Sequence, residues 1–115
     1  WAERHRVVHL SSRPGPWRNQ VTPYATGIMD AGFFPSVRTV SIMKCPQSAG
    51  TEAIHNCVAY TIDRAPAVLY VYPDEATARE NAQDRIIPML HASPRLREYL
   101  TGMSDDLEHF KFYFL

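Results

Sequence analysis

The run from Met43 to Glu52 is the part of this sequence best suited to chemistry. It reads Met-Lys-Cys-Pro-Gln-Ser-Ala-Gly-Thr-Glu, with a lysine near its start and a threonine near its end. A lysine supplies a point charge for phosphate, and a hydroxyl on the first turn of a helix can ligate magnesium. Backbone N–H groups of a loop that leads into a helix also point at an anion. The run therefore indicates a phosphate-binding loop.

The run departs from the standard phosphate-loop pattern G-x-x-x-x-G-K-[ST]. When Thr51 is aligned with the hydroxyl, Lys44 takes the first glycine position, Ala49 the second, and Gly50 the lysine position. A positive φ at position 49 would be strained because alanine carries a Cβ, and Pro46 lacks a backbone donor. The pattern is equally compatible with an ordinary turn between a strand and a helix, in which a glycine provides curvature.

Two predicted strands and one helix would position this loop. The segment Val37–Met43 is rich in β-branched residues and predicts a strand before the loop. From Thr51 onward, apolar residues recur at helical spacing as far as Ile62. The continuous apolar run Ala67–Tyr72 is typical of a strand buried on both faces of a parallel sheet.

Local signals predict four further elements. Thr22 followed by Pro23 begins a helix that runs to Ala31 and ends at Gly32. Another helix starts at Pro73-Asp74-Glu75 and continues to about Leu90, with a bend or an end at Pro88. Ser93-Pro94 begins a short helix that reaches Leu100, and Phe110–Leu115 is predicted to be a strand. Strands that alternate with helices predict an α/β fold with a mostly parallel sheet.

Composition excludes several classes of protein. The 115 residues include 12 Lys and Arg against 12 Asp and Glu, so no global field attracts nucleic acid or a membrane surface. The apolar runs are much shorter than the roughly 20 residues that span a bilayer. The five histidines and two cysteines show no zinc-type spacing. The chain begins at Trp1 and stops inside the apolar run Phe110–Leu115, so we expect it to be part of a longer protein.

An ordered series of segments resembles the large terminase subunit of lambda-like phages. The run Met43–Glu52 resembles the deviant Walker A loop of that family, in which a lysine or arginine often starts the loop and Thr-Glu begins the helix. Ser12–Arg18, followed by Thr22-Pro23-Tyr24, resembles the family's segment upstream of the loop. Val71-Tyr72-Pro73 and the two motifs Arg85–Met89 and Ser93–Leu96 resemble its second strand and the following helices. The likeness extends from about Trp1 to Leu100.

The resemblance implies a fold and a role for each matching residue. The fold would be the three-layer P-loop NTPase type, with residues 1–115 forming the N-terminal portion of its ATPase domain. Lys44 would carry the charge to the β- and γ-phosphates in place of the lysine missing at position 50. The remaining assigned residues would bind ATP and Mg²⁺: Gln47, Ser48, Ala49, Gly50 and Glu52 around the phosphates, Thr51 on the metal, and Tyr24 with Trp17 or Arg18 against the adenine.

The resemblance also implies partners and missing parts. The full-length protein would drive double-stranded DNA into a procapsid, as a homo-oligomeric ring on the portal, together with a small terminase subunit. It would act in the host cytoplasm without a membrane. The Walker B acid and the nuclease carboxylates are expected after Leu115, so this portion would bind ATP without hydrolysing it alone.

Several alternatives remain open from the residues alone. Trp17 and Tyr24 could simply cover one edge of the core, and Lys44 could be a solvated charge at a strand end. The whole chain could be a non-enzymatic α/β interaction module, or it could belong to a helicase-like ATPase that shares an upstream adenine-contacting segment.

Overall fold

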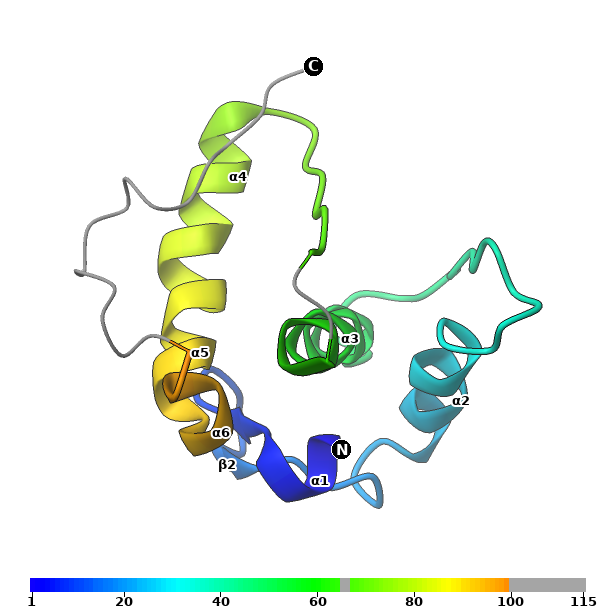
Figure 1. Cartoon of the computed structure of the whole chain (residues 1–115), viewed down its shortest axis with the longest axis horizontal. Helices are drawn as coiled ribbons and strands as arrows, with labels where there is room; N and C mark the ends of the chain where they lie inside the picture. The colour runs from blue at the N-terminus through cyan, green and yellow to red at the C-terminus, as the bar shows by residue number, and fades with distance from the viewer. Residues whose placement is uncertain (65–66, 100–115) are drawn as a thin grey trace.

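A central helix, α3 (Gly50–Arg64), organises the computed structural model, which describes residues 1–64 and 67–99. Figure 1 shows α3 end-on, with the other elements arranged around it. The remaining elements are α1 (Ala2–His5), β1 (Val7–Val8), β2 (Gly15–Pro16), α2 (Pro23–Ala31), α4 (Glu75–Asn81), the π-helix η1 (Ala82–Ile86), α5 (Ile87–Ala92) and α6 (Pro94–Arg97). Every helix within the described ranges is too short or too polar to cross a membrane.

The predictions for α2 and α3 are confirmed. Thr22 occupies the N-cap of α2, Pro23 is its first residue, and Gly32 is its C-cap. Gly32 has an ordinary right-handed φ of −66°, so the helix ends there without the left-handed turn for which glycine is usually needed. Helix α3 begins at Gly50, one residue before the predicted start. The loop that precedes it therefore leads directly into a helix N-terminus.

The predicted helix from Pro73 to Leu90 is present but changes type along its length. Asp74 caps α4 by accepting a hydrogen bond of 2.8 Å from the Thr77 N–H. The π-helix η1 then precedes α5, whose second residue is Pro88. Because proline has no N–H to donate back along the helix, the regular hydrogen-bond ladder is interrupted at this point. The bend predicted at Pro88 is thus a change in helical pitch just before the proline.

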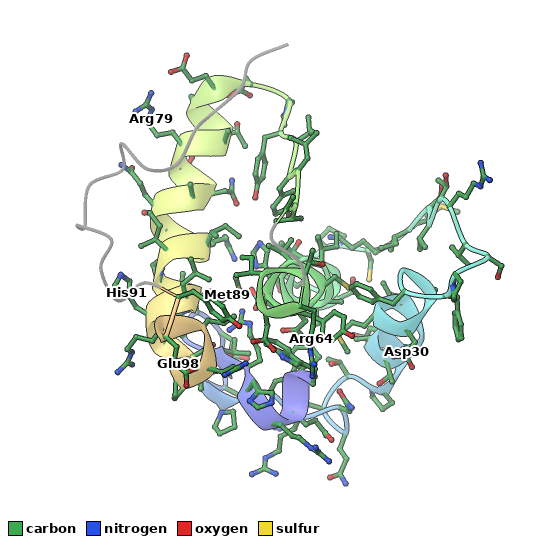
Figure 2. All side chains as sticks on the ribbon, viewed as in Figure 1. Asp30, Arg64, Arg79, Met89, His91 and Glu98 are labelled. Atoms are coloured by element: carbon green, nitrogen blue, oxygen red, sulfur yellow. The ribbon has the colours of Figure 1, made fainter. Side chains whose placement is uncertain are left out.

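The core consists of two clusters that meet different parts of α3. Ala53 packs with Val8, Trp17 and Ala25, which joins the N-terminal hairpin and α2 to the beginning of α3. Ala59 belongs to a second cluster toward the end of α3, with Met89, Leu90 and Leu96 from α5 and α6. Figure 2 shows Met89 on the side of α5 that faces α3, whereas Arg79 and His91 lie on the outer side of the same helical column.

The prediction of two strands around the loop is wrong for the described residues. Val37–Met43 and Ala67–Tyr72 run as extended chain without a hydrogen-bonded strand partner. Most of their apolar side chains are exposed, with Met43 at 101% and Leu69 at 77% exposure. A strand exists through its ladder to a neighbour, and no described segment supplies one to either of them.

The sheet in the described ranges is instead a short antiparallel pair. Val7 lies opposite Pro16, and Val8 lies opposite Gly15. Val7–Leu10 has a β-branched start typical of extended chain, whereas the prolines and glycine of Ser11–Pro23 are typical of loop, so no local signal indicates β2. The predicted strand Phe110–Leu115 lies outside the described residues.

Candidate functional site

The loop before α3 folds into a tight curve rather than an extended connection. Gln47 and Ala49 both have φ of +57°, in the left-handed region that glycine usually occupies. Gly50 is the first helical residue, so the left-handed Ala49 is followed directly by the right-handed Gly50. This alternation turns successive backbone amides toward one concave side. The strain foreseen for an alanine at position 49 is therefore present.

The side chain of Lys44 lies across the start of α3. A Cβ added at Gly50 would come within 2.2 Å of Lys44 Cδ and 3.0 Å of Lys44 Cε. The stem of Lys44 thus occupies the space that any side chain at position 50 would need. One further bond places the ammonium nitrogen within about 5 Å of that position. The motif alignment assigns its missing lysine to position 50, and the stem of Lys44 lies beside that position.

The first turn of α3 begins beside this lysine. The amide of Ala53 donates to Ala49 O at 2.9 Å. By helix geometry, the N–H groups of Gly50, Thr51 and Glu52 have no acceptor inside the helix. They carry the positive end of the helix dipole. The half-buried Thr51 is the second residue of this turn.

The upstream segment contacts the loop through α2. The Tyr24 hydroxyl donates a hydrogen bond of 2.9 Å to Ser48 O, and the Tyr24 ring is 57% exposed. The Ser48 hydroxyl in turn donates to Cys45 O at 2.8 Å, which closes the loop on itself. Tyr24 thus contacts the loop through its hydroxyl, while its predicted place against the adenine stays a prediction.

Trp17 and Arg18 lie in different environments. Trp17 is 7% exposed within the cluster that contains Ala53, and its indole N–H donates to Asn19 Oδ1 at 2.8 Å. This placement agrees with the interpretation of Trp17 as a core residue, which the sequence left open. Arg18 is exposed. Of the pair Trp17 and Arg18, the arginine is the one whose side chain is available to a ligand.

The side chain of Glu52 is engaged in ion pairs. Its Oε2 lies 2.8 Å from Arg6 Nη2, while Oε1 lies 3.4 Å from His55 Nδ1 and 4.0 Å from Arg85 Nη1. Burial alone would raise the pKa of Glu52, but the hydrogen bond from His55 and the positive charges of Arg6, His55 and Arg85 outweigh burial and lower it. Glu52 is therefore ionised at neutral pH, and its backbone N–H remains its contribution to the helix start.

Sequence reasoning did not single out Arg6 or His55 for this site. Arg6 is 46 residues away from Glu52 in sequence, so no local spacing could pair them. The available signal was weaker, namely a glutamate at helical i, i+3 spacing from His55. Arg6 is nevertheless 2% exposed, and a buried charge of this kind requires a partner.

A cavity of about 460 Å³ lies elsewhere, between α1, α2 and α3. Its lining includes Trp1, Asp30, Phe33, Asn56 and Tyr60, and none of residues 44–52 contributes to it. Within the described residues, no group of three or more His, Cys, Asp or Glu side chains could hold a metal ion. The first amides of α3, which have no acceptor inside the helix, the Lys44 side chain and the Thr51 hydroxyl are the features that fit an anionic ligand.

Comparison with known proteins reveals one family. The model of the phage terminase large subunit gpA, ATPase domain, matches residues 11–112. No curated protein and no solved structure shows significant similarity to the chain. The match includes the loop, α2, α3 and the helices that follow, so it extends over most of the chain.

Proposed function

The chain belongs to the family of ATPase domains of phage terminase large subunits, and on that premise we propose that Lys44–Glu52 is its nucleotide-binding loop. The family forms the ATP-dependent part of a viral DNA-packaging motor. The observation that carries the proposal is the contact between Lys44 and Gly50 at the start of α3. This contact supports the proposal that Lys44, from the other end of the loop, serves in place of the lysine of the standard phosphate loop.

The residues of this loop fit MgATP. The amides of Gly50 and Thr51 and the helix dipole would receive phosphate oxygens, and the Lys44 ammonium would neutralise the terminal phosphates. A Thr51 hydroxyl on the first turn is the type of ligand that holds magnesium together with phosphate oxygens. Bound magnesium would supply charge neutralisation to the phosphates. Gln47, Ser48 and Ala49 would line the concave side with backbone groups.

We propose that the adenine base of the nucleotide lies near α2. Tyr24 contacts the loop and is exposed, and Arg18 is exposed on the same upstream segment. An aromatic ring and a planar guanidinium both stack on a purine. Trp17 would then act indirectly, because it fixes the upstream segment against Ala53 in α3.

The proposed fold is the three-layer P-loop type, of which residues 1–115 form the N-terminal portion. The exposed apolar residues of Val37–Met43 and Ala67–Tyr72 support this proposal, because exposed apolar surface of this kind marks a face that another element covers. Hydrolysis would need the Walker B acid and a water-orienting base, which are expected after Leu115. In the full-length protein, the partners would be double-stranded DNA, the small subunit, the portal and further copies of the ring, in the host cytoplasm.

Calorimetric titration with Mg-ATPγS tests the nucleotide site. Lys44→Ala removes a charged phosphate contact, so affinity should fall by about 10- to 100-fold. Arg38→Ala is the matched control, because Arg38 is an exposed cation in the segment that leads to the loop; its affinity should stay within about twofold. Equal binding by the wild type and Lys44→Ala would remove Lys44 from the site. Absence of binding by the wild type would favour the non-enzymatic α/β module.

A further inference from the structure

A largely buried ion cluster is centred on Glu52 in the first turn of α3. The Arg6 side chain is 1% exposed and the Glu52 side chain 18%, and they pair at 2.8 Å. Arg6 follows α1, Glu52 lies in α3, and Arg85 comes from η1. Arg6 also donates to the backbone oxygen of Val7, while its own backbone oxygen accepts the Trp17 N–H at 2.9 Å. These contacts with the N-terminal hairpin, formed by β1 and β2, fix the guanidinium independently of its ion pair with Glu52.

The location of Glu52 creates an electrostatic conflict for a nucleotide site. A carboxylate in the first turn of a helix is attracted to the positive end of the dipole. A polyphosphate bound at the same N-terminus would use the same field and the same amides. Glu52 follows Thr51 directly, so an uncompensated carboxylate there would repel the ligand. Three basic groups, Arg6, His55 and Arg85, surround this one carboxylate.

We propose that Arg6 is a positioning residue that neutralises Glu52 and holds its carboxylate away from the phosphates. This inference rests on the proposed nucleotide site at Lys44–Thr51. Arg6 itself does not touch the nucleotide in this account. Its charge cancels the charge of Glu52, and its rigid attachment to the hairpin fixes the direction in which the carboxylate points. The N-terminal hairpin therefore contributes to nucleotide affinity without contacting the ligand.

A purely structural role for the pair makes a different prediction. If the Arg6–Glu52 pair only held α3 in place, loss of either partner would lower stability and affinity together. If Arg6 contacted the phosphates directly, its loss would weaken binding whatever residue stands at position 52. Under the positioning role, the affinity lost with Arg6 returns when the charge at position 52 is removed as well.

The test compares Arg6→Met, Glu52→Gln and the double variant R6M/E52Q by calorimetric titration with Mg-ATPγS, with the melting temperature of each protein measured in parallel. Arg6→Met should weaken binding by at least about tenfold, because it removes the closest cation from the Glu52 carboxylate and leaves only the longer contacts with His55 and Arg85. R6M/E52Q should bind within about threefold of the wild type. Glu52→Gln alone should bind as the wild type or more tightly.

The control is an Arg–Glu ion pair outside the site with the same nitrogen–oxygen distance. Arg79 Nη2 lies 2.8 Å from Glu75 Oε1 on α4, with both side chains more than half exposed. The double variant E75Q/R79M should leave the affinity unchanged.

If Arg6→Met does not fold, the double variant R6M/E52Q still tests the positioning role of Arg6, because it buries no unpaired charge. Nucleotide affinity of R6M/E52Q that is tenfold or more below that of the wild type would overturn the proposal. Wild-type affinity in a folded Arg6→Met variant would overturn it as well. If the wild type binds nucleotide and Lys44→Ala does not, such a result would overturn the role of Arg6 alone. Absence of binding by the wild type would overturn the nucleotide site and this inference together.

Discussion

Two departures from the standard phosphate-loop motif lie within the loop. The motif lacks a lysine at position 50, and the stem of Lys44 fills the space beside Gly50. The motif also lacks its second glycine, and Ala49 adopts the left-handed conformation in spite of its Cβ. A sequence comparison identifies both departures but cannot show where the flexible side chain of Lys44 lies relative to Gly50. The second departure leaves residual strain that can be measured.

Ala49→Gly should relieve that strain. Glycine adopts φ of +57° without a steric penalty, while it loses more backbone entropy on folding. The net gain should be about 0.5–1 kcal/mol in the free energy of unfolding, which corresponds to a few degrees in melting temperature. Urea titration monitored by circular dichroism measures this gain.

Ala53→Gly provides the matched control for this substitution. Ala53 is 0% exposed in the regular part of α3, so glycine there should lower stability by about 1 kcal/mol or more. A loss of similar size for both variants would contradict the account of Ala49 as a strained residue.

At the scale of elements, helices could be predicted from sequence and strands could not. The start of α2 follows from Pro23 at its first position, which is a local preference, although Thr22 makes no side-chain capping hydrogen bond. Val37–Met43 has the composition of a strand, yet its conformation depends on a neighbour that lies far away in sequence. The pairing of Arg6 with Glu52 is equally non-local. Sequence reasoning therefore located the loop and its helix but missed the partners that fix them.

The extended segments should contribute little to the stability of this chain. Met43→Ala removes a side chain that is 101% exposed, so the free energy of unfolding should change by less than about 0.5 kcal/mol. Met89→Ala is the same substitution at a side chain that is 0% exposed between α5 and α3, and it should cost about 2–4 kcal/mol. Chemical denaturation of both variants gives the comparison. Comparable losses would mean that Met43 is buried against another element in solution.

At the scale of the whole molecule, Asp63 ties the two ends of the described chain to α3. Its carboxylate accepts hydrogen bonds from Trp1 Nε1 at 2.7 Å, from Arg95 Nε at 2.8 Å and from the Tyr99 hydroxyl at 2.8 Å. Burial by itself would raise the pKa of Asp63, but these hydrogen bonds and the charge of Arg95 outweigh burial and lower it. The carboxylate is thus more stable as an anion in the folded protein than in the unfolded chain.

This lowered pKa predicts a pH-dependent contribution to stability. The stabilisation is present above the unfolded pKa of about 3.9 and is lost as pH falls through the lower folded value. Asp63→Asn should therefore lower the free energy of unfolding by about 1–2 kcal/mol at pH 7, with a gap to the wild type that narrows as pH falls below about 4. Thermal melts of the wild type and Asp63→Asn from pH 7 to pH 3 measure this difference in stability.

Asp30→Asn serves as the control for the pH series. Asp30 is exposed on α2, as Figure 2 shows, so its removal should change stability by less than about 0.5 kcal/mol at each pH. An Asp63→Asn gap that stays constant down to pH 3 would contradict the role assigned to the Asp63 carboxylate.

Relocation of the lysine tests the central claim most directly. The double variant Lys44→Ala/Gly50→Lys moves the cation to the motif's usual position and clears the stem that would obstruct it. Calorimetry with Mg-ATPγS should show weak binding by Lys44→Ala and recovery to within about tenfold of wild-type affinity by the double variant, because the ammonium returns to the same helix start. Wild-type affinity in Lys44→Ala, or no recovery in the folded double variant, would contradict the claim that Lys44 replaces the missing lysine.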